Sequence, residues 1–222
     1  MRMYRQIFLI LILFGAIQGM DGQGKMKFSV HADPQFAWFS SDDDSISPDG
    51  SIFHLQAGLQ MENYFRENYA FYVGFGINNL GGNLNYLKSE DYIKNDDDTI
   101  TITGGQSVKM NLQYLDIPLG LKLKTEELGY ATFFLQIGFN PMININARVT
   151  SEDESLDKVS IKESIHIFNL GYHVGAGVEY RLGGSTSLIG GIRWVSGFTN
   201  VTKQDGANIS LNAISINLGI LF

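Results

Sequence analysis

The chain has 222 residues, enough for one domain with its own core, and it contains 25 glycines, 4 prolines and no cysteine. A formal charge of −7 without a basic patch argues against a nucleic-acid partner, and the lack of cysteine excludes a disulfide framework. Abundant glycine, 12% aromatic residues and many short alternating segments favour an all-β barrel or sandwich.

Residues 1–22 have the pattern of a signal peptide. Two arginines lie among the first five residues, and an apolar run follows over residues 7–17. This run is about half of the ~20 residues that a membrane-spanning helix needs. We predict cleavage between residues 19 and 24, with an uncleaved helical anchor as the alternative. A single domain of residues 23–222 remains, and no segment in it could form a transmembrane helix.

Eight stretches of the remaining chain alternate between apolar residues and polar or small residues. Successive side chains of a strand point to opposite faces, so each stretch predicts a strand with one apolar face. In the stretch 130–146, Phe134 breaks the pattern by placing a large apolar residue on the polar face. The predicted strands are residues 26–39, 52–65, 69–79, 111–124, 130–146, 165–181, 186–199 and 209–222.

The polar face indicates which side of the sheet is inside. It is rich in Gly, Asn, Ser and Gln and lacks the Lys and Glu density of a solvated surface. Small residues suit the crowded interior of a narrow barrel, and an apolar outer face suits lipid. A sheet that spans a membrane must also close, because lipid offers no partner to an open edge. We predict an all-β fold, an eight-stranded antiparallel up-and-down transmembrane β-barrel; the alternative is a soluble, lipocalin-like barrel.

The connections between the predicted strands alternate in length. In an up-and-down barrel, alternate connections lie at opposite ends. All the long connections therefore lie at one end, and both termini lie at the other. Long extracellular loops and short periplasmic turns are typical of outer-membrane barrels. We therefore expect the cell outer membrane, with periplasmic termini and extracellular long loops. The long connections are 40–51, 80–110, 147–164 and 200–208, and the short ones are 66–68, 125–129 and 182–185.

The last predicted strand ends in Phe222, on the same face as other large apolar residues. A terminal aromatic residue on such a strand is similar to the signal that the barrel-assembly machinery reads. The alternative is that Phe222 simply ends an edge strand. We expect it to be an assembly signal.

Several charged residues fall on the predicted inner face. One interpretation is a gate, in which Asp116 or Glu179 pairs with Arg193 and opens a water path when the pair breaks. The other is a structural plug, which we favour because an eight-stranded barrel is filled by its side chains. The predicted lumen charge network comprises Glu62, Asp116, Lys122, Glu179, Arg181 and Arg193.

Acidic runs mark three of the predicted outer loops. Clustered carboxylates can hold hard cations such as Ca²⁺ or Mg²⁺, shared in this case with lipopolysaccharide phosphates. The run from Asp96 to Thr99 lacks the spacing and the turn glycine of a calcium loop, and we expect solvated loops with no metal or cofactor. The weak candidates are Asp42, Asp43, Asp44, Asp96, Asp97 and Asp98, and the third run is Glu152, Asp153 and Glu154.

No catalytic motif is present. A Gly-x-Ser-x-Gly sequence, a phosphate loop and metal-ligand spacing are all absent, and His54 and His173 fall on the inner face, away from lipid. We therefore predict that the protein is not an enzyme. Aromatic residues near strand ends are expected to form interface girdles. They are Trp38, Tyr64, Tyr69, Trp194 and Phe198.

Three segments resemble a known family. The run Tyr114-Leu115-Asp116-Ile117-Pro118-Leu119-Gly120-Leu121-Lys122, the run Gly175-Ala176-Gly177-Val178-Glu179-Tyr180, and Arg193-Trp194 followed by Gly197 and Asn200 look like strands of the Bacteroidetes outer-membrane β-barrel family, called PorT-like. Trp194 departs from the tyrosine usual there. The resemblance covers nearly the whole mature chain and implies an eight-stranded outer-membrane barrel. The family's founding branch is linked to type IX protein secretion.

The leading hypothesis is a non-enzymatic barrel with long acidic extracellular loops and a structural or interaction role. Its expected partners are outer-membrane lipid, lipopolysaccharide and the barrel-assembly machinery, with no nucleic acid. One alternative, implied by the resemblance, is an accessory component of a type IX-like secretion system that binds secretion-complex proteins. Another is a small channel or a lipid-modifying enzyme.

Overall fold

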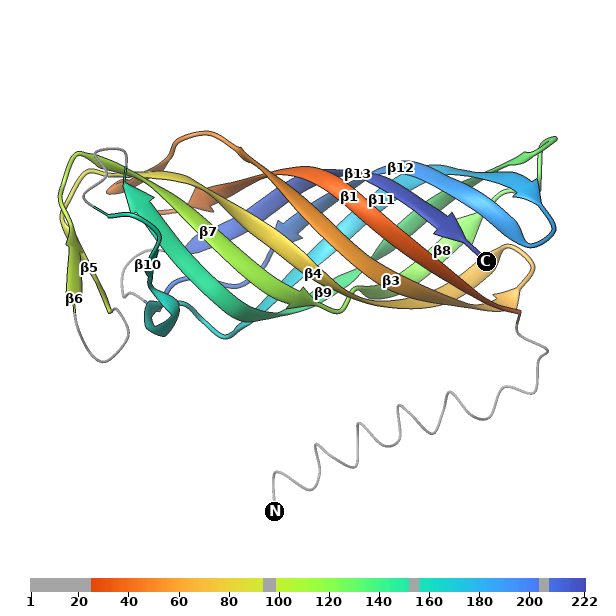
Figure 1. Ribbon diagram of the computed structural model, residues 1–222, viewed down its shortest axis with the longest axis horizontal. Helices are drawn as coiled ribbons and strands as arrows, with labels where there is room; N and C mark the ends of the chain where they lie inside the picture. The colour runs from red at the N-terminus through yellow and green to blue at the C-terminus, as the bar shows by residue number, and fades with distance from the viewer. Residues whose placement is uncertain (1–24, 94–98, 152–155, 204–207) are drawn as a thin grey trace, which may run out of the picture.

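The computed structural model describes residues 25–93, 99–151, 156–203 and 208–222, and all its long elements are β-strands (Figure 1). A short 3-10 helix, η2 (Lys162–Ser164), lies in one connection. Within these ranges, no helix is long and apolar enough to cross a membrane. The predicted signal peptide, residues 1–22, lies outside the described residues.

Eight long strands form one closed antiparallel ring, if β7 and β8 are counted as one interrupted strand. Each strand pairs with its neighbour in the sequence, and β1 pairs with β13 to close the ring. The predicted up-and-down barrel is therefore confirmed. The strands are β1 (Met26–Ser41), β3 (Ile52–Arg66), β4 (Tyr69–Tyr86), β7 (Gln106–Asp116), β8 (Leu119–Lys124), β9 (Ala131–Ser151), β11 (Phe168–Gly183), β12 (Thr186–Gly197) and β13 (Ile209–Leu221).

The two ends of the barrel differ. Three short turns lie at the end where β1 begins and β13 ends, which we call the turn end (Figure 1). One of these turns uses Gly183 and Gly184 at φ values of 147° and 58°, a region that favours glycine. The four long connections lie at the opposite end, the loop end. They contain β2 (Ile46–Pro48), β5 (Glu90–Ile93), β6 (Thr99–Ile102) and β10 (Val159–Ser160).

The outer face of the barrel is apolar, as the alternation predicts. Phe75 is 57% exposed and Ile216 is 52% exposed, whereas the inward-facing Glu62 and Asp116 are fully buried. This arrangement is the inverse of a soluble barrel. It fits a wall surrounded by lipid, with the polar groups gathered in the lumen.

Near the loop end, the apolar residues change from the outer face to the inner face. In β4 the exposed apolar series ends at Ile77, and Leu80 and Leu84 beyond it are buried inside. In β13 the same change separates the exposed Ile214 from the buried Leu211. Beyond this level, which we call the switch level, the barrel is apolar inside and polar outside, like a soluble protein. The switch level therefore marks one boundary of the lipid-facing belt.

Three strands, β4, β7 and β9, extend well past their predicted bounds because of this change. The predicted connection 80–110 contains the end of β4 and the start of β7, and the predicted connection 147–164 contains the end of β9. Apolar and polar residues still alternate in these segments, but the apolar residues now face inward and the polar residues face outward. The sequence pattern of the membrane segment therefore stops at the switch level. In β9 the exchange coincides with a register shift opposite Gln113 and Tyr114.

The predicted strand 111–124 is interrupted once. Pro118 has no N–H to donate, and it separates β7 from β8. The sheet stays continuous because the Pro118 carbonyl accepts the N–H of Gly74 at 2.7 Å, and Ile117 donates to the carbonyl of Pro141 at 3.0 Å.

Candidate functional site

Most of the buried polar side chains point into the lumen. In the half of the lumen near the turn end, they surround one lysine. Lys122 on β8 is 1% exposed. Its Nζ lies 2.5 Å from Oε1 of Glu62 on β3 and 2.6 Å from Oε1 of Glu179 on β11. The neighbours Leu121 and Leu123 point outward, so alternation directs Lys122 into the barrel.

Further groups complete this ionic cluster. Lys124 forms a second ion pair with Glu179, while the Tyr64 hydroxyl donates to Glu62 at 2.6 Å. The Lys122 ammonium also lies 4.6 Å from the ring centre of Phe134, a cation–π contact. The outlier in the predicted alternation is thereby explained, because the Phe134 ring packs inside the barrel against a buried cation.

Asp116 forms a second polar cluster, made of amides and not of ions. Its carboxylate accepts hydrogen bonds from Gln56 at 3.0 Å, from Asn78 at 3.2 Å and from Asn140 at 3.0 and 3.1 Å. Such donors satisfy a buried carboxylate without a cation. The Asn140 side chain also hydrogen-bonds to His173, which joins this cluster to β11.

Asp33 occupies the seam where the first and last strands meet. Between His31 and Gln35 the regular pairing of β1 with β13 is interrupted, and Pro34 has no N–H to offer. The Asp33 carboxylate accepts the backbone N–H of Leu218 at 3.1 Å and the side chain of Asn217 at 3.0 Å. A buried side chain thus takes the place of a backbone partner in the closing seam.

A small cavity lies beside this seam, bordered in part by Ser29, His31 and Arg193. Its volume is about 20 Å³, room for a water molecule. Arg193 is 4% exposed, and its hydrogen bond to Gln136 (3.4 Å) and its ion pair with Asp33 (4.0 Å) are both long. Its Nε and Nη1 atoms have no hydrogen-bond partner within the described residues. An ordered water would satisfy them.

The chemistry open to these groups is limited by access. Ser29, His31 and Asp33 share one face of β1, and His31 Nδ1 lies 2.7 Å from Asp33. Nucleophilic catalysis requires a hydroxyl bonded to the imidazole and space for a substrate. Within the described residues no hydrogen bond joins Ser29 to His31, and the adjoining cavity holds no more than water. Among the described residues, this set therefore meets neither requirement.

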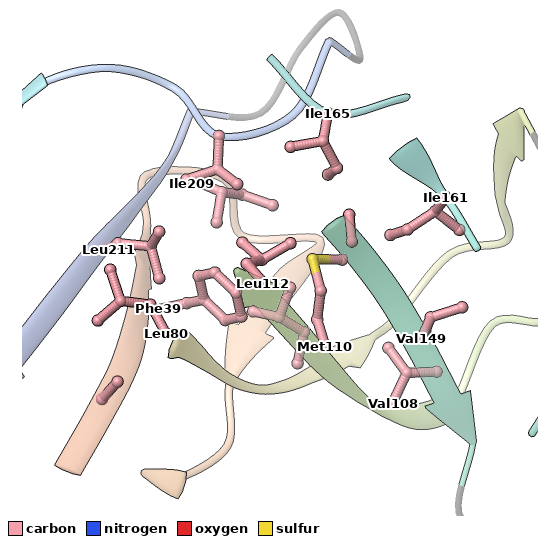
Figure 2. Close-up of a cluster of buried hydrophobic side chains, with 14 of the residues drawn as sticks. Phe39, Leu80, Val108, Met110, Leu112, Val149, Ile161, Ile165, Ile209 and Leu211 are labelled. Carbon is pink, nitrogen blue, oxygen red and sulfur yellow. The ribbon is translucent and has the colours of Figure 1, made fainter. Parts of the chain in front are cut away.

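The loop-end half of the lumen is filled by apolar side chains (Figure 2). Phe39, Met110 and Leu112 project inward from β1 and β7 and are at most 2% exposed. Ile161 and Ile165, from the connection after β9, are buried against them. Described residues of the connections thus pack against the inner wall at the barrel mouth. The whole set, here called the apolar plug, is Ala37, Phe39, Ile46, Leu80, Leu84, Tyr86, Ile102, Val108, Met110, Leu112, Tyr114, Met142, Ala147, Val149, Ile161, Ile165, Val195, Val201, Ile209, Leu211 and Ala213.

The structure places five of the six predicted network residues inside the barrel: Glu62, Asp116, Lys122, Glu179 and Arg193. The prediction for Arg181 is wrong. Its side chain is 48% exposed at the turn end and pairs with Glu127 at 2.6 Å, because β11 has left the lumen at that point.

The expected pairing of Asp116 or Glu179 with Arg193 is also wrong. Asp116 is held by amides, and Glu179 is held by two lysines. The cation that pairs with carboxylates across the lumen is instead Lys122. A gate that opens by breaking a single pair with Arg193 therefore has no geometric basis.

Sequence reasoning missed Asp33 and Lys124, although the signal for both was present. Each lies two residues from an inward position on its own strand, so strict alternation would have included them. The apolar plug was missed for another reason. Several of its residues, such as Leu80, Met110 and Val149, come from segments predicted as loops, and only the fold brings them together with residues of the predicted strands.

The acidic residues of the first loop have structural partners. The backbone N–H of Ser45 donates to Asp43 at 2.7 Å and lowers the pKa of that carboxyl below its usual value, and Asp42 accepts the N–H of Asn208 at 2.8 Å. In the described part of the chain, no three acidic or histidine side chains gather as a metal site. The runs 96–98 and 152–154 lie outside the described residues.

Aromatic side chains lie near both ends of the outer face. Tyr172 contacts Trp194 and Phe198 toward the loop end, with ring centres 5.5 and 4.7 Å apart. Phe65 packs on Tyr69 at the turn end. The expectation for Tyr64 is wrong, because it points inward to Glu62 and is 8% exposed. Trp38 is half-buried on the outward face of β1.

Comparison with known proteins agrees with this architecture. The family model described as "Outer membrane protein beta-barrel domain" matches residues 23–203. No curated protein matches the chain.

Among solved structures, Neisserial surface protein A is 14% identical over 87% of this chain and 95% of its own, with a TM-score of 0.46. Ail, the attachment invasion locus protein of Yersinia pestis, is 12% identical over 90% of this chain and 100% of its own, with a TM-score of 0.44. The outer membrane protease OmpT from Escherichia coli is 7% identical over 91% of this chain and 97% of its own, with a TM-score of 0.48.

The family match spans most of the chain and includes all but the last of the long strands in full. With the closed ring and its apolar outer face, it places the protein in the outer membrane. The chain belongs to the outer membrane protein beta-barrel domain family.

Proposed function

We propose that this protein is a non-conducting, non-enzymatic anchor in the outer membrane, whose loop end contacts a partner outside the cell. The observation that carries the proposal is the filled lumen. The ionic cluster occupies its turn-end half, the apolar plug occupies its loop-end half, and the cavity beside Arg193 measures only about 20 Å³. A barrel filled in this way has no path for solutes.

The loop end offers a surface that is suited to contact. β4, β7 and β9 extend past the switch level, whereas β12 and β13 end closer to it (Figure 1). Above the switch level, the outward positions on β4 and β7 include Asn83, Asn85, Asn111 and Gln113, all partly exposed. We call this surface the amide wall. Amide side chains both donate and accept hydrogen bonds, which favours contact with protein or carbohydrate over contact with lipid.

The proposed orientation has the loop end outside the cell and both termini in the periplasm. It rests on the long connections lying at the end opposite the termini. The chain has no cysteine, so single introduced cysteines can be labelled cleanly. An impermeant maleimide should label Leu87→Cys on intact cells and should label Glu67→Cys only after lysis. The reverse pattern would overturn the orientation.

Photo-crosslinking in cells tests the interaction role. A crosslinker at Asn111 on the amide wall should capture one defined protein reproducibly, and a crosslinker at the lipid-facing Ile137, 50% exposed, should not. Capture of the same protein from both positions, or of none from the wall, would contradict the proposal.

A secretion role is the second candidate, and its support is the resemblance of three strand segments to the PorT-like family. On this reading the captured partners are secretion-complex proteins, and deletion of the gene abolishes cargo secretion. A channel or a lipid-modifying enzyme would instead show steady conductance, or lipid turnover that is lost on substitution of His31 or His173.

A further inference from the structure

Two cations lie side by side on the outer face of the barrel, just beyond the switch level. Lys109 on β7 pairs with Thr150 on β9, and the next outward position of β7, Asn111, pairs with Arg148. Lys109 and Arg148 are therefore diagonal neighbours on one face, with Cβ atoms roughly 7–8 Å apart. Both side chains are exposed.

Their height relative to the lipid belt follows from β9. Ile145 is the last exposed apolar residue on that strand, at 39%, and Arg148 lies three residues further on. Three residues correspond to about 10 Å along a strand, and less along the barrel axis because strands are tilted. Arg148 thus lies at the depth of lipid headgroups, and the long stem of Lys109 allows its ammonium to reach down to the same level.

The position is distinctive around the barrel. On four other strands, an outward residue near the same level is uncharged: Ser40, Asn79, Ser196 and Asn212. Lys109 and Arg148 have no ion pair with any other described residue.

A third cation lies close by. The backbone N–H of Lys158 donates to the Thr150 hydroxyl at 3.3 Å, so this exposed lysine borders the pair on the far side of β9. Three cationic side chains thus lie near one another, and the exposed Asp157 directly precedes the third.

We propose that Lys109 and Arg148 bind the phosphate groups of a phosphorylated glycolipid in the outer leaflet. A guanidinium can hold a phosphate through two parallel hydrogen bonds, and an ammonium adds a point charge beside it. The acyl chains of the same lipid would lie along the exposed belt of β9 below Arg148. The site anchors the barrel at a fixed depth in the outer leaflet. It rests on the orientation proposed above.

The test uses the full-length mature chain folded in detergent and titrated with lipid A that carries both phosphates. The variant Lys109→Gln/Arg148→Gln removes the two charges at exposed strand positions. The matched control, Lys25→Gln/Arg66→Gln, removes two exposed charges at the turn end. Folding of each is checked by the shift in gel mobility between unheated and boiled samples, and binding is measured by native mass spectrometry.

We expect the loop-end variant to bind about 30-fold more weakly than the unmodified chain, because each cation near an anionic lipid surface contributes about a factor of five. The turn-end control should bind as the unmodified chain does, and dephosphorylated lipid A should bind poorly to all three. Equal binding by both variants, or unchanged binding of the dephosphorylated lipid, would overturn the site.

The cysteine-labelling experiment is independent of this titration, so the two failures can be told apart. Loss of lipid A binding in the loop-end variant, together with extracellular labelling of the loop end, supports the proposal. If the same loss accompanies periplasmic labelling of the loop end, the outer-leaflet glycolipid is overturned as the ligand, and so is the proposed orientation.

Discussion

Replacement of Lys122 by methionine is the sharpest test of the lumen cluster. The ammonium lies between the carboxylates of Glu62 and Glu179, and all three side chains are at most 3% exposed. Methionine matches the stem of lysine in size but carries no charge. The substitution therefore removes the cation that both carboxylates share, with little change in packed volume.

The size of the effect follows from what remains. Removing one partner of a buried ion pair costs about 3–5 kcal/mol, because an uncompensated charge stays buried. Glu179 keeps Lys124, and Glu62 keeps hydrogen bonds from Tyr64 at 2.6 Å and from Gln60 at 3.1 Å. We therefore expect a loss near the lower limit, about 3 kcal/mol in the free energy of unfolding. Glu62→Gln in the same chain should recover more than about 1 kcal/mol, since the two residues are coupled.

The assay is reversible urea unfolding in lipid vesicles, followed by tryptophan fluorescence. Arg181→Gln is the control, because it removes a cation whose ion pair is half-exposed, and it should cost less than about 1 kcal/mol. A loss below about 1 kcal/mol for Lys122→Met, at an unchanged denaturant slope, would refute the reasoning that this cluster holds the lumen together.

Three further substitutions test the packing, the seam and the strand end. Gly177→Ala should lower the free energy of unfolding by about 1–3 kcal/mol in the same titration, since a Cβ there would meet the Phe134 ring at 2.6 Å. Gly190→Ala has open space and should be neutral. Equal losses in the two variants would contradict the view that the inward glycines are needed for packing. Asp33→Ala should cost about 2–3 kcal/mol by leaving the Leu218 N–H unpaired, and Asp33→Asn should cost less; similar losses would show that no carboxylate oxygen is needed in the seam. Phe222→Ala should leave in vitro stability within about 1 kcal/mol, because its backbone pairing persists, yet lower the amount assembled in cells, as measured by surface immunoblot; an unchanged amount would dismiss it as an assembly signal.

The sequence alone predicts the part of the barrel in which a single physical rule decides which way each side chain points. In the lipid-facing belt, outward positions must be apolar and inward ones small or polar, so alternation alone assigned the eight strands and the inward placement of Lys122. The same rule would have placed Asp33, had it been applied to every charged residue of the first strand.

Beyond the belt, the rule reverses and the sequence becomes harder to interpret. Leu80 and Leu84 face inward because water surrounds the outer wall there, and a pattern read with the membrane rule assigns them to loops. The sequence also could not predict which side chains pair with one another inside the lumen. Alternation shows that Asp116 and Arg193 face inward, but their pairing depends on distances across the barrel that only the fold sets.

Planar-bilayer recording of the refolded mature chain tests the sealed lumen most directly. The filled lumen predicts no steady conductance at moderate voltage, either for the unmodified chain or for Arg193→Gln, because no single pair acts as a gate. Steady stepwise conductance from protein that shows the folded gel mobility would contradict the sealed barrel and favour a channel.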